Sequence, residues 1–171
     1  MQNLSNELHT HISSLRRYAM ALVGNPADAD DLVQETLQKA LAYMQKGREI
    51  RNVRGYLFTI LHNTRISQLR RPENGASHVP FEDVVGGLAV AANQHHRAEL
   101  KGLLRELMKL REEQRQVVLL VCVEGLTYRE AAAVIGVPIG TVMSRLARAR
   151  QTLIERTTAD VSRTSMLKMV K

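Results

Sequence analysis

Apolar residues recur three and four positions apart along most of this chain, and this spacing is typical of helices. Near the N-terminus the series reads Leu8, Ile12, Leu15, Ala19 and Leu22. Such residues fall on one face of a helix of 3.6 residues per turn, which can then be buried against other helices. The pattern predicts an amphipathic helix that ends at Gly24, and an all-α fold.

Start and stop signals predict two more helices in the first half. Asn25 can cap a helix that begins at Pro26 and continues to about Gly47, since proline suits the first helical position. Asn52 can cap a helix over residues 53–71, which Pro72 would stop.

Residues 72–97 lack any sustained period and are rich in proline, glycine and asparagine. A chain of 171 residues can hold two small helical domains with thin cores. We therefore expect one domain at 1–71, a flexible linker at 72–97, a second domain at 98–160 and a tail at 161–171.

The second half contains one segment where local propensity and context disagree. Residues 117–123 are seven consecutive apolar residues rich in valine, which favours a buried strand. Every neighbouring segment is helical, however, and the sequence offers no partner strand. We expect a buried helix here.

The charge pattern favours a polyanion as partner. The chain carries a formal charge of +7, and its two predicted domains are both basic whereas the predicted linker is acidic. The single cysteine, Cys122, excludes an internal disulfide and fits a reducing compartment. Neither a signal peptide nor an apolar run of about 20 residues is present, so we expect a cytoplasmic protein without membrane insertion.

The sharpest local signal is a helix-turn-helix pattern between residues 127 and 151. Thr127 and Glu130 have the spacing of a capping box at the start of a short helix. Gly136 would end that helix, and Val137 with Pro138 would form a tight turn before the second helix. The sequence thus predicts a duplex-DNA-reading motif.

The second helix of this motif would present one face to the major groove. The candidate DNA-binding residues on or beside that face are Thr141, Met143, Ser144, Arg145, Ala147, Arg148 and Gln151. Arg145, with Arg150, suits phosphate contacts, whereas Arg148 could make a bidentate contact with guanine. The alternative is that these arginines only solvate an exposed helix face.

Three segments resemble the extracytoplasmic-function (ECF) sigma factors of the sigma-70 family. LREEQRQVVLLVCVEGLTYREAAAVIGVPIGTVMSRLARARQTL (110–153) resembles region four, and both ADADDLVQETLQKAL (27–41) and RNVRGYLFTILHNTRISQLRR (51–71) resemble region two. GYLFTILHNTRIS (55–67) further resembles the general-stress subgroup of alphaproteobacteria. The resemblance implies an alternative sigma factor that binds core RNA polymerase and promoter DNA, and that is regulated by an anti-sigma factor.

The resemblance also implies roles for residues of the first domain. The acidic helix would bind core polymerase through Asp31, Gln34, Glu35 and Gln38, which share one helix face. A solvated face is the alternative for this stripe.

The minus-ten promoter element would be opened by capture of an extruded base. The residues implied for this step are Arg48, Arg51, Asn52, Asn63, Thr64, Ser67 and Arg70. Tyr56 and Phe58 are the nearest aromatic residues, and either could belong to the core.

The chain departs from the family pattern in the second domain, where Leu110-Arg111 replaces the common Leu-Pro, and at two positions of the DNA-reading helix. Met143 stands where a basic residue is common, and Ala147 where a bulkier one is frequent, so the resemblance does not fix the base preference there.

An enzyme is disfavoured, because the sequence has no glycine-rich phosphate loop, nucleophile elbow or metal-ligand spacing. We expect no cofactor and no metal, and we interpret His78, His95 and His96 as solvated residues of the predicted linker. Two other functions remain open. A stand-alone helix-turn-helix regulator would leave the first 71 residues unexplained, and a sigma-like mimic would bind an anti-sigma factor without touching promoters.

Overall fold

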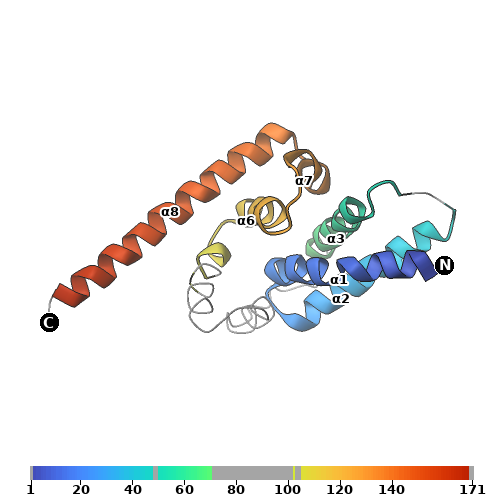
Figure 1. Cartoon of the computed structure of the whole chain (residues 1–171), viewed down its shortest axis with the longest axis horizontal. Coiled ribbons are helices and arrows are strands. Elements are labelled where there is room, and N and C mark those ends of the chain that lie inside the picture. The colour runs from blue at the N-terminus through green and yellow to red at the C-terminus, as the bar shows by residue number, and fades with distance from the viewer. Residues whose placement is uncertain (1, 48–49, 71–101, 103–104, 170–171) are drawn as a thin grey trace.

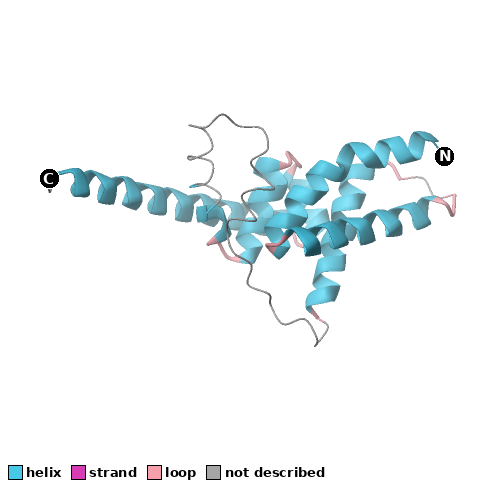
Figure 2. Cartoon of the chain, turned by 90° about the horizontal axis from the view of Figure 1, so that it is seen from below, coloured by secondary structure: helices cyan, strands magenta, loops and turns pink. Residues whose placement is uncertain are grey.

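The chain is helical throughout the part that the structure describes. The computed structural model describes residues 2–47, 50–70, 102 and 105–169. Its helices are α1 (Gln2–Val23), α2 (Pro26–Met44), α3 (Val53–Leu69), α6 (Glu112–Val118), the π-helix η1 (Leu119–Val123), α7 (Tyr128–Ile135) and α8 (Ile139–Met169). Figures 1 and 2 show no strand in these ranges, which confirms the all-α prediction. The predicted linker at 72–97 lies outside the described residues.

Helices α1, α2 and α3 form an N-terminal module, residues 2–70. As predicted, Asn25 caps α2, and its side-chain oxygen accepts from the backbone N–H of Asp28 at 2.7 Å. The chain reverses between α1 and α2 at Gly24, whose φ of +84° suits glycine. Tyr18 and Phe58 meet edge to face in the core, with ring centroids 5.5 Å apart.

Helices α6, η1, α7 and α8 form a C-terminal module, residues 105–169. Residues 105–108 are also helical. Val117, Leu120, Val134 and Val142 are fully buried or nearly so, and they form the centre of this module. Helix α8 continues to Met169, so it runs without a break through the predicted boundary between the second domain and the tail at 160–161 (Figure 1).

The valine-rich run is helical, as predicted, but it is not buried along its whole length. Its second part winds as the π-helix η1, and the N–H of Glu124 donates to the carbonyl of Leu119 at 2.8 Å. Within this segment Cys122 is exposed and Val123 is 48% exposed. The expectation of a fully buried segment was therefore wrong for these two residues.

The two modules contact each other directly. Helix α3 packs against α7, and the buried apolar residues of both modules form one cluster (Figure 1). The sequence predicted two small helical domains but gave no sign that they would dock. This contact brings the first residues of α3 close to the start of the helix-turn-helix.

Candidate DNA and polymerase interfaces

The predicted capping box begins the first helix of the helix-turn-helix. The Oε2 atom of Glu130 accepts from the backbone N–H of Thr127 at 2.8 Å, and the Thr127 hydroxyl accepts from the Glu130 N–H at 3.2 Å. The hydrogen bond from the Thr127 backbone is the main reason why the pKa of Glu130 is lowered. The carboxylate therefore stays ionised at neutral pH, as the cap requires.

A sharp turn then sets the angle between the two helices. Gly136 ends α7 in the left-handed conformation, with φ +74°. Helix α7 and the segment Ile139–Arg156 of α8 are bent by 102° at this turn, within the range typical of a helix-turn-helix. Among the described residues, no single helix is long and apolar enough to span a membrane. Only α7 and Ile139–Arg156 taken together reach that length and apolar character, and they are bent at this turn.

The second helix buries one stripe and exposes the opposite face. Val142, Leu146 and Ala149 are buried against the rest of the module. The exposed members of the predicted DNA-reading set are Met143, Ser144, Ala147, Arg148 and Gln151. Thr141 and Arg145 are half-buried at the edge of this face, so they are less accessible than expected. Gln151 donates to Glu155 at 2.7 Å.

The predicted polymerase-binding residues lie on α2. Asp31, Gln34 and Gln38 are exposed, whereas Glu35 is half-buried. The Glu35 carboxylate is held by Lys39 at 2.7 Å and by Gln68 of α3 at 3.3 Å. Leu41, three residues after Gln38, is 41% exposed and extends this stripe.

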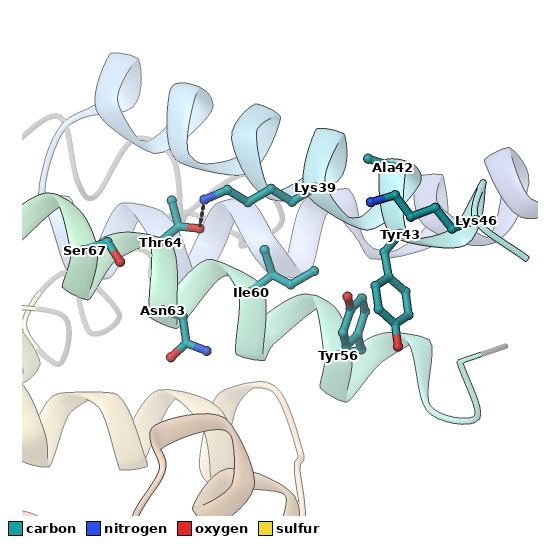
Figure 3. A pocket seen from close by; sticks show the side chains of 9 residues that line it. All are labelled: Lys39, Ala42, Tyr43, Lys46, Tyr56, Ile60, Asn63, Thr64 and Ser67. Carbon is teal, nitrogen blue, oxygen red and sulfur yellow. Dashed lines mark hydrogen bonds between the residues drawn. The ribbon is translucent and has the colours of Figure 1, made fainter. Parts of the chain in front are cut away.

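A pocket of about 440 Å³ lies between α2 and α3, and we call it the α2–α3 pocket. Figure 3 shows the residues that line it, which are Lys39, Ala42, Tyr43, Lys46, Tyr56, Ile60, Asn63, Thr64 and Ser67. Three of the residues predicted for the minus-ten element, Asn63, Thr64 and Ser67, thus come together. Tyr56 joins them, whereas Phe58 is fully buried in the core.

The other predicted minus-ten residues lie elsewhere. Arg51 and Arg70 are exposed but are not among the residues that line the pocket, and Arg48 lies outside the described residues. Asn52 caps α3 by accepting from the Gly55 N–H at 2.8 Å. Its Nδ2 atom donates to Oε1 of Glu130 at 3.0 Å, so this residue contacts the helix-turn-helix.

Thr64 differs from the expectation of an accessible hydroxyl. Its side chain is buried, with the residue only 3% exposed, and its oxygen accepts from the Lys39 ammonium at 2.9 Å (Figure 3). The Thr64 oxygen is therefore already engaged by Lys39.

Sequence reasoning missed the residues that α2 contributes to the pocket. Lys39, Tyr43 and Lys46 follow each other at spacings of four and three, so they share one face of α2. Tyr43 and Tyr56 lie next to each other at one end of the pocket, with ring centroids 5.1 Å apart (Figure 3). The spacing was visible in the sequence, but it did not reveal that this face meets α3.

The described residues contain no group of three or more His, Cys, Asp and Glu side chains able to hold a metal ion. His78, His95 and His96 lie outside the described residues.

Fold and site together define an all-helical protein of two modules, one with a helix-turn-helix and the other with a polar, aromatic-lined pocket. Residues 100–153 match the family model for region 4 of sigma-70, and residues 8–62 match the model for the sigma2 domain of PhyR. The chain is 36% identical over 155 residues to the ECF RNA polymerase sigma factor EcfG of Rhodopseudomonas palustris, covering 88% of this chain and 83% of that protein. It is 31% identical over 139 residues to the ECF sigma factor SigC of Mycobacterium tuberculosis, covering 79% and 73%. This chain belongs to the ECF sigma factor family.

Solved structures agree with this assignment. The sigma factor RpoE in complex with the anti-sigma factor NepR from Bartonella quintana superposes with a TM-score of 0.70 at 31% identity, covering 94% of this chain and 99% of that one. CnrH in complex with the cytosolic domain of CnrY gives 0.63 at 26% identity, covering 91% and 88%. The matches to EcfG and to the RpoE–NepR complex also confirm the resemblance to the alphaproteobacterial general-stress subgroup.

Proposed function

We propose that this protein is an alternative sigma factor of the cytoplasm, which binds core RNA polymerase, directs it to specific promoters and acts by binding, not by catalysis. One observation carries the proposal: the same chain holds a helix-turn-helix with an exposed reading face and, on its other module, a pocket lined by polar and aromatic residues. A protein that reads only duplex DNA has no need of the second site.

The α2–α3 pocket has the chemistry to hold an extruded base of the minus-ten element. Asn63 offers an amide that can both donate and accept hydrogen bonds, and Ser67 adds a hydroxyl. Tyr43 and Tyr56 supply aromatic faces for stacking. Because extrusion of a base costs a few kcal/mol of stacking, such a pocket is needed to stabilise the open strand.

Lys39 and Lys46 line the same pocket and would place positive charge beside the DNA backbone. Arg51 and Arg70 are exposed at the two ends of α3 and could extend this path along the single strand. Arg48 is assigned the same role by the family pattern.

The helix-turn-helix would read the minus-thirty-five element as duplex. Arg148 is exposed on the face opposite the buried stripe and can reach a guanine edge, whereas Arg145, at the rim, suits a phosphate. Met143 is 52% exposed on the same face and would contact a base through apolar surface, for example a thymine methyl group.

The stripe on α2 would bind core polymerase. Asp31, Gln34 and Gln38 are exposed there, and a basic partner surface would complement them together with Glu35. The solved structure of RpoE is a complex with the anti-sigma factor NepR, and that of CnrH is a complex with the cytosolic domain of CnrY. We propose that an anti-sigma factor also binds this chain.

Reconstituted transcription tests the proposed function. The purified protein and core polymerase that lacks its own specificity subunit are incubated with genomic DNA fragments, and transcript start sites are mapped. We expect new start sites that share two motifs and that depend on both components. A protein that binds neither core enzyme nor any promoter would disprove the proposal.

The match of residues 8–62 to the sigma2 domain of PhyR favours a second candidate, a sigma-like protein that binds an anti-sigma factor without initiating transcription. That candidate predicts binding to the anti-sigma factor but no start sites in the same assay. The two functions are therefore separated by one experiment.

A further inference from the structure

The two lysines of the α2–α3 pocket differ in how their charges are paired. The Nζ atom of Lys39 lies 2.7 Å from Oε1 of Glu35, one turn earlier on α2. Lys46 lies at the end of the pocket beside Tyr43 and forms no ion pair with any residue that the structure describes (Figure 3). The positive charge of the pocket is therefore offset at one lysine and not at the other.

Glu35 is held in place through both oxygens of its carboxylate. Its Oε1 contacts Lys39, and its Oε2 accepts from Nε2 of Gln68 on α3 at 3.3 Å. Lys39 in turn donates to the hydroxyl of Thr64, a residue that lines the pocket, at 2.9 Å (Figure 3). A continuous series of contacts thus runs from Gln68 through Glu35 and Lys39 to the wall of the pocket.

This ion pair is open to solvent and to an approaching polyanion. The side chains of Lys39 and Glu35 are 49% and 42% exposed. Binding of nucleic acid is favoured by each phosphate that a cation neutralises, because counterions are released from the strand. A phosphate near Lys39 would meet the carboxylate of Glu35 as well as the ammonium group. Lys39 should therefore attract a strand less than Lys46 does.

We propose that Glu35 is a positioning residue of the α2–α3 pocket: it holds Lys39 beside Thr64 and, by offsetting the charge of this lysine, limits the affinity of the free protein for single-stranded DNA. The inference rests on the proposed function, because it takes an opened DNA strand as the ligand of the pocket. It gives Glu35 a second role besides the one in the stripe on α2.

Binding of a fluorescent oligothymidylate to the free, full-length protein across a salt series tests this role. Glu35→Gln removes the negative charge but keeps the shape of the side chain, and its amide oxygen can still accept a hydrogen bond. If the released Lys39 neutralises one phosphate, the slope of log affinity against log salt should become steeper by about 0.7. The affinity should then exceed that of the wild type about eightfold at 50 mM salt and about threefold at 200 mM salt.

Double-mutant cycles establish whether the gain arises through Lys39. Lys39→Met and Lys46→Met each remove one ammonium group from the pocket. We expect Glu35→Gln to raise the affinity fully in the Lys46→Met background and hardly at all in the Lys39→Met background. A merely structural role of Glu35 would not distinguish between the two lysines.

Asp30→Asn is the matched control for the loss of one negative charge from α2. Asp30 is 53% exposed and pairs with Arg16 at 2.7 Å, and neither residue lines the pocket. Its replacement therefore makes the same change of charge in a comparable ion pair, and we expect it to keep the wild-type salt slope. Circular dichroism establishes that every variant keeps its helical content.

Three results would each overturn the proposal: no gain of affinity in Glu35→Gln, an equal gain in Asp30→Asn, or a gain that persists in the Lys39→Met background. The oligothymidylate carries no promoter and the assay contains no polymerase, so its outcome does not depend on the proposed function. If the wild type failed to initiate at promoters while the cycle showed coupling, the function would fall and the role of Glu35 would remain. An additive cycle together with normal initiation would remove only the role of Glu35.

Discussion

The ammonium group of Lys39 donates to the hydroxyl of Thr64 across 2.9 Å and thereby ties α2 to the buried side of the α2–α3 pocket. The same ammonium lies 2.7 Å from Oε1 of Glu35, a member of the stripe proposed to bind polymerase. One side chain therefore borders two proposed interfaces. A partner that draws Glu35 away from Lys39 would leave the charge of this lysine at the pocket without its carboxylate partner.

Replacement of Lys39 by methionine should lower the affinity of the holoenzyme for the opened minus-ten strand. Methionine keeps the length and apolar stem but removes the charge that faces the strand. If Lys39 neutralises one phosphate, the slope of log affinity against log salt should become shallower by about 0.7. Binding of a single-stranded minus-ten oligonucleotide across a salt series measures this slope.

Lys109→Met is the matched control for Lys39→Met. Lys109 pairs with Glu106 in the C-terminal module and borders neither proposed site. We expect it to keep the wild-type slope; an unchanged slope in Lys39→Met would remove this lysine from the proposed path of the strand.

Asn63→Ala should impair strand opening more than closed-complex formation. The change removes the amide that we propose to bind the extruded base, and a lost hydrogen bond of this kind is worth about 1 kcal/mol, or roughly a fivefold smaller open fraction. Permanganate reactivity of the melted region reports opening, and footprinting at low temperature reports the closed complex. Equal loss of both signals would contradict the assignment of Asn63 to the pocket.

Local signals in the sequence predicted the helix caps, because a cap depends only on neighbouring residues. The caps at Asn25, Asn52 and Thr127 were foreseen because each lies three residues or fewer from the group it contacts. The π-helix was not foreseen, because its wider turn within an apolar run has no signal of its own.

Contacts between distant residues could not be predicted in the same way. Arg17 and Glu124 are 107 residues apart, and no local pattern indicates that one pairs with the other. The face of α2 that carries Lys39 and Tyr43 had the right spacing for a common site. Only the packing of α2 on α3 shows that this face meets Asn63 and Ser67 in one pocket.

Arg148→Ala should reduce binding to duplex that carries the minus-thirty-five element and leave core-enzyme affinity nearly unchanged. If Arg148 contacts guanine, the loss is about 1 to 3 kcal/mol at the cognate base and smaller on other sequences. Titration of cognate and scrambled duplexes distinguishes these cases. Arg129→Ala removes the same charge from an exposed position of α7 and serves as control. If core-enzyme affinity fell as much as duplex binding, the assignment of Arg148 to DNA contact alone would be refuted.

The buried pair of Tyr18 and His62 should make stability depend on pH below neutrality. His62 is 5% exposed, and its Nδ1 lies 3.4 Å from the Tyr18 hydroxyl. Burial lowers the pKa of His62, and Glu112 opposes this shift only in part. Burial likewise raises the pKa of Tyr18, so the phenol stays protonated and can donate to a neutral imidazole.

The direction of the effect follows from proton binding in the two states. Below the ordinary histidine pKa of about 6.5, the unfolded chain binds a proton at residue 62 that the folded protein does not yet bind. The free energy of unfolding should therefore fall as the pH drops through 6.5, and continue to fall until the folded protein is protonated as well. Urea unfolding at a series of pH values from 7.5 to 5 measures this slope.

His62→Gln should flatten that dependence, whatever it does to stability at pH 7.5, because glutamine does not titrate. His9→Gln, at an exposed position of α1, should keep the wild-type slope and so controls for the loss of one histidine. The pKa of Glu130 is also lowered, but carboxyl groups titrate at lower pH, so their contribution falls mostly below the range of His62. If His62→Gln kept the wild-type slope from pH 7 to 5.5, the pH dependence would have to arise from other groups.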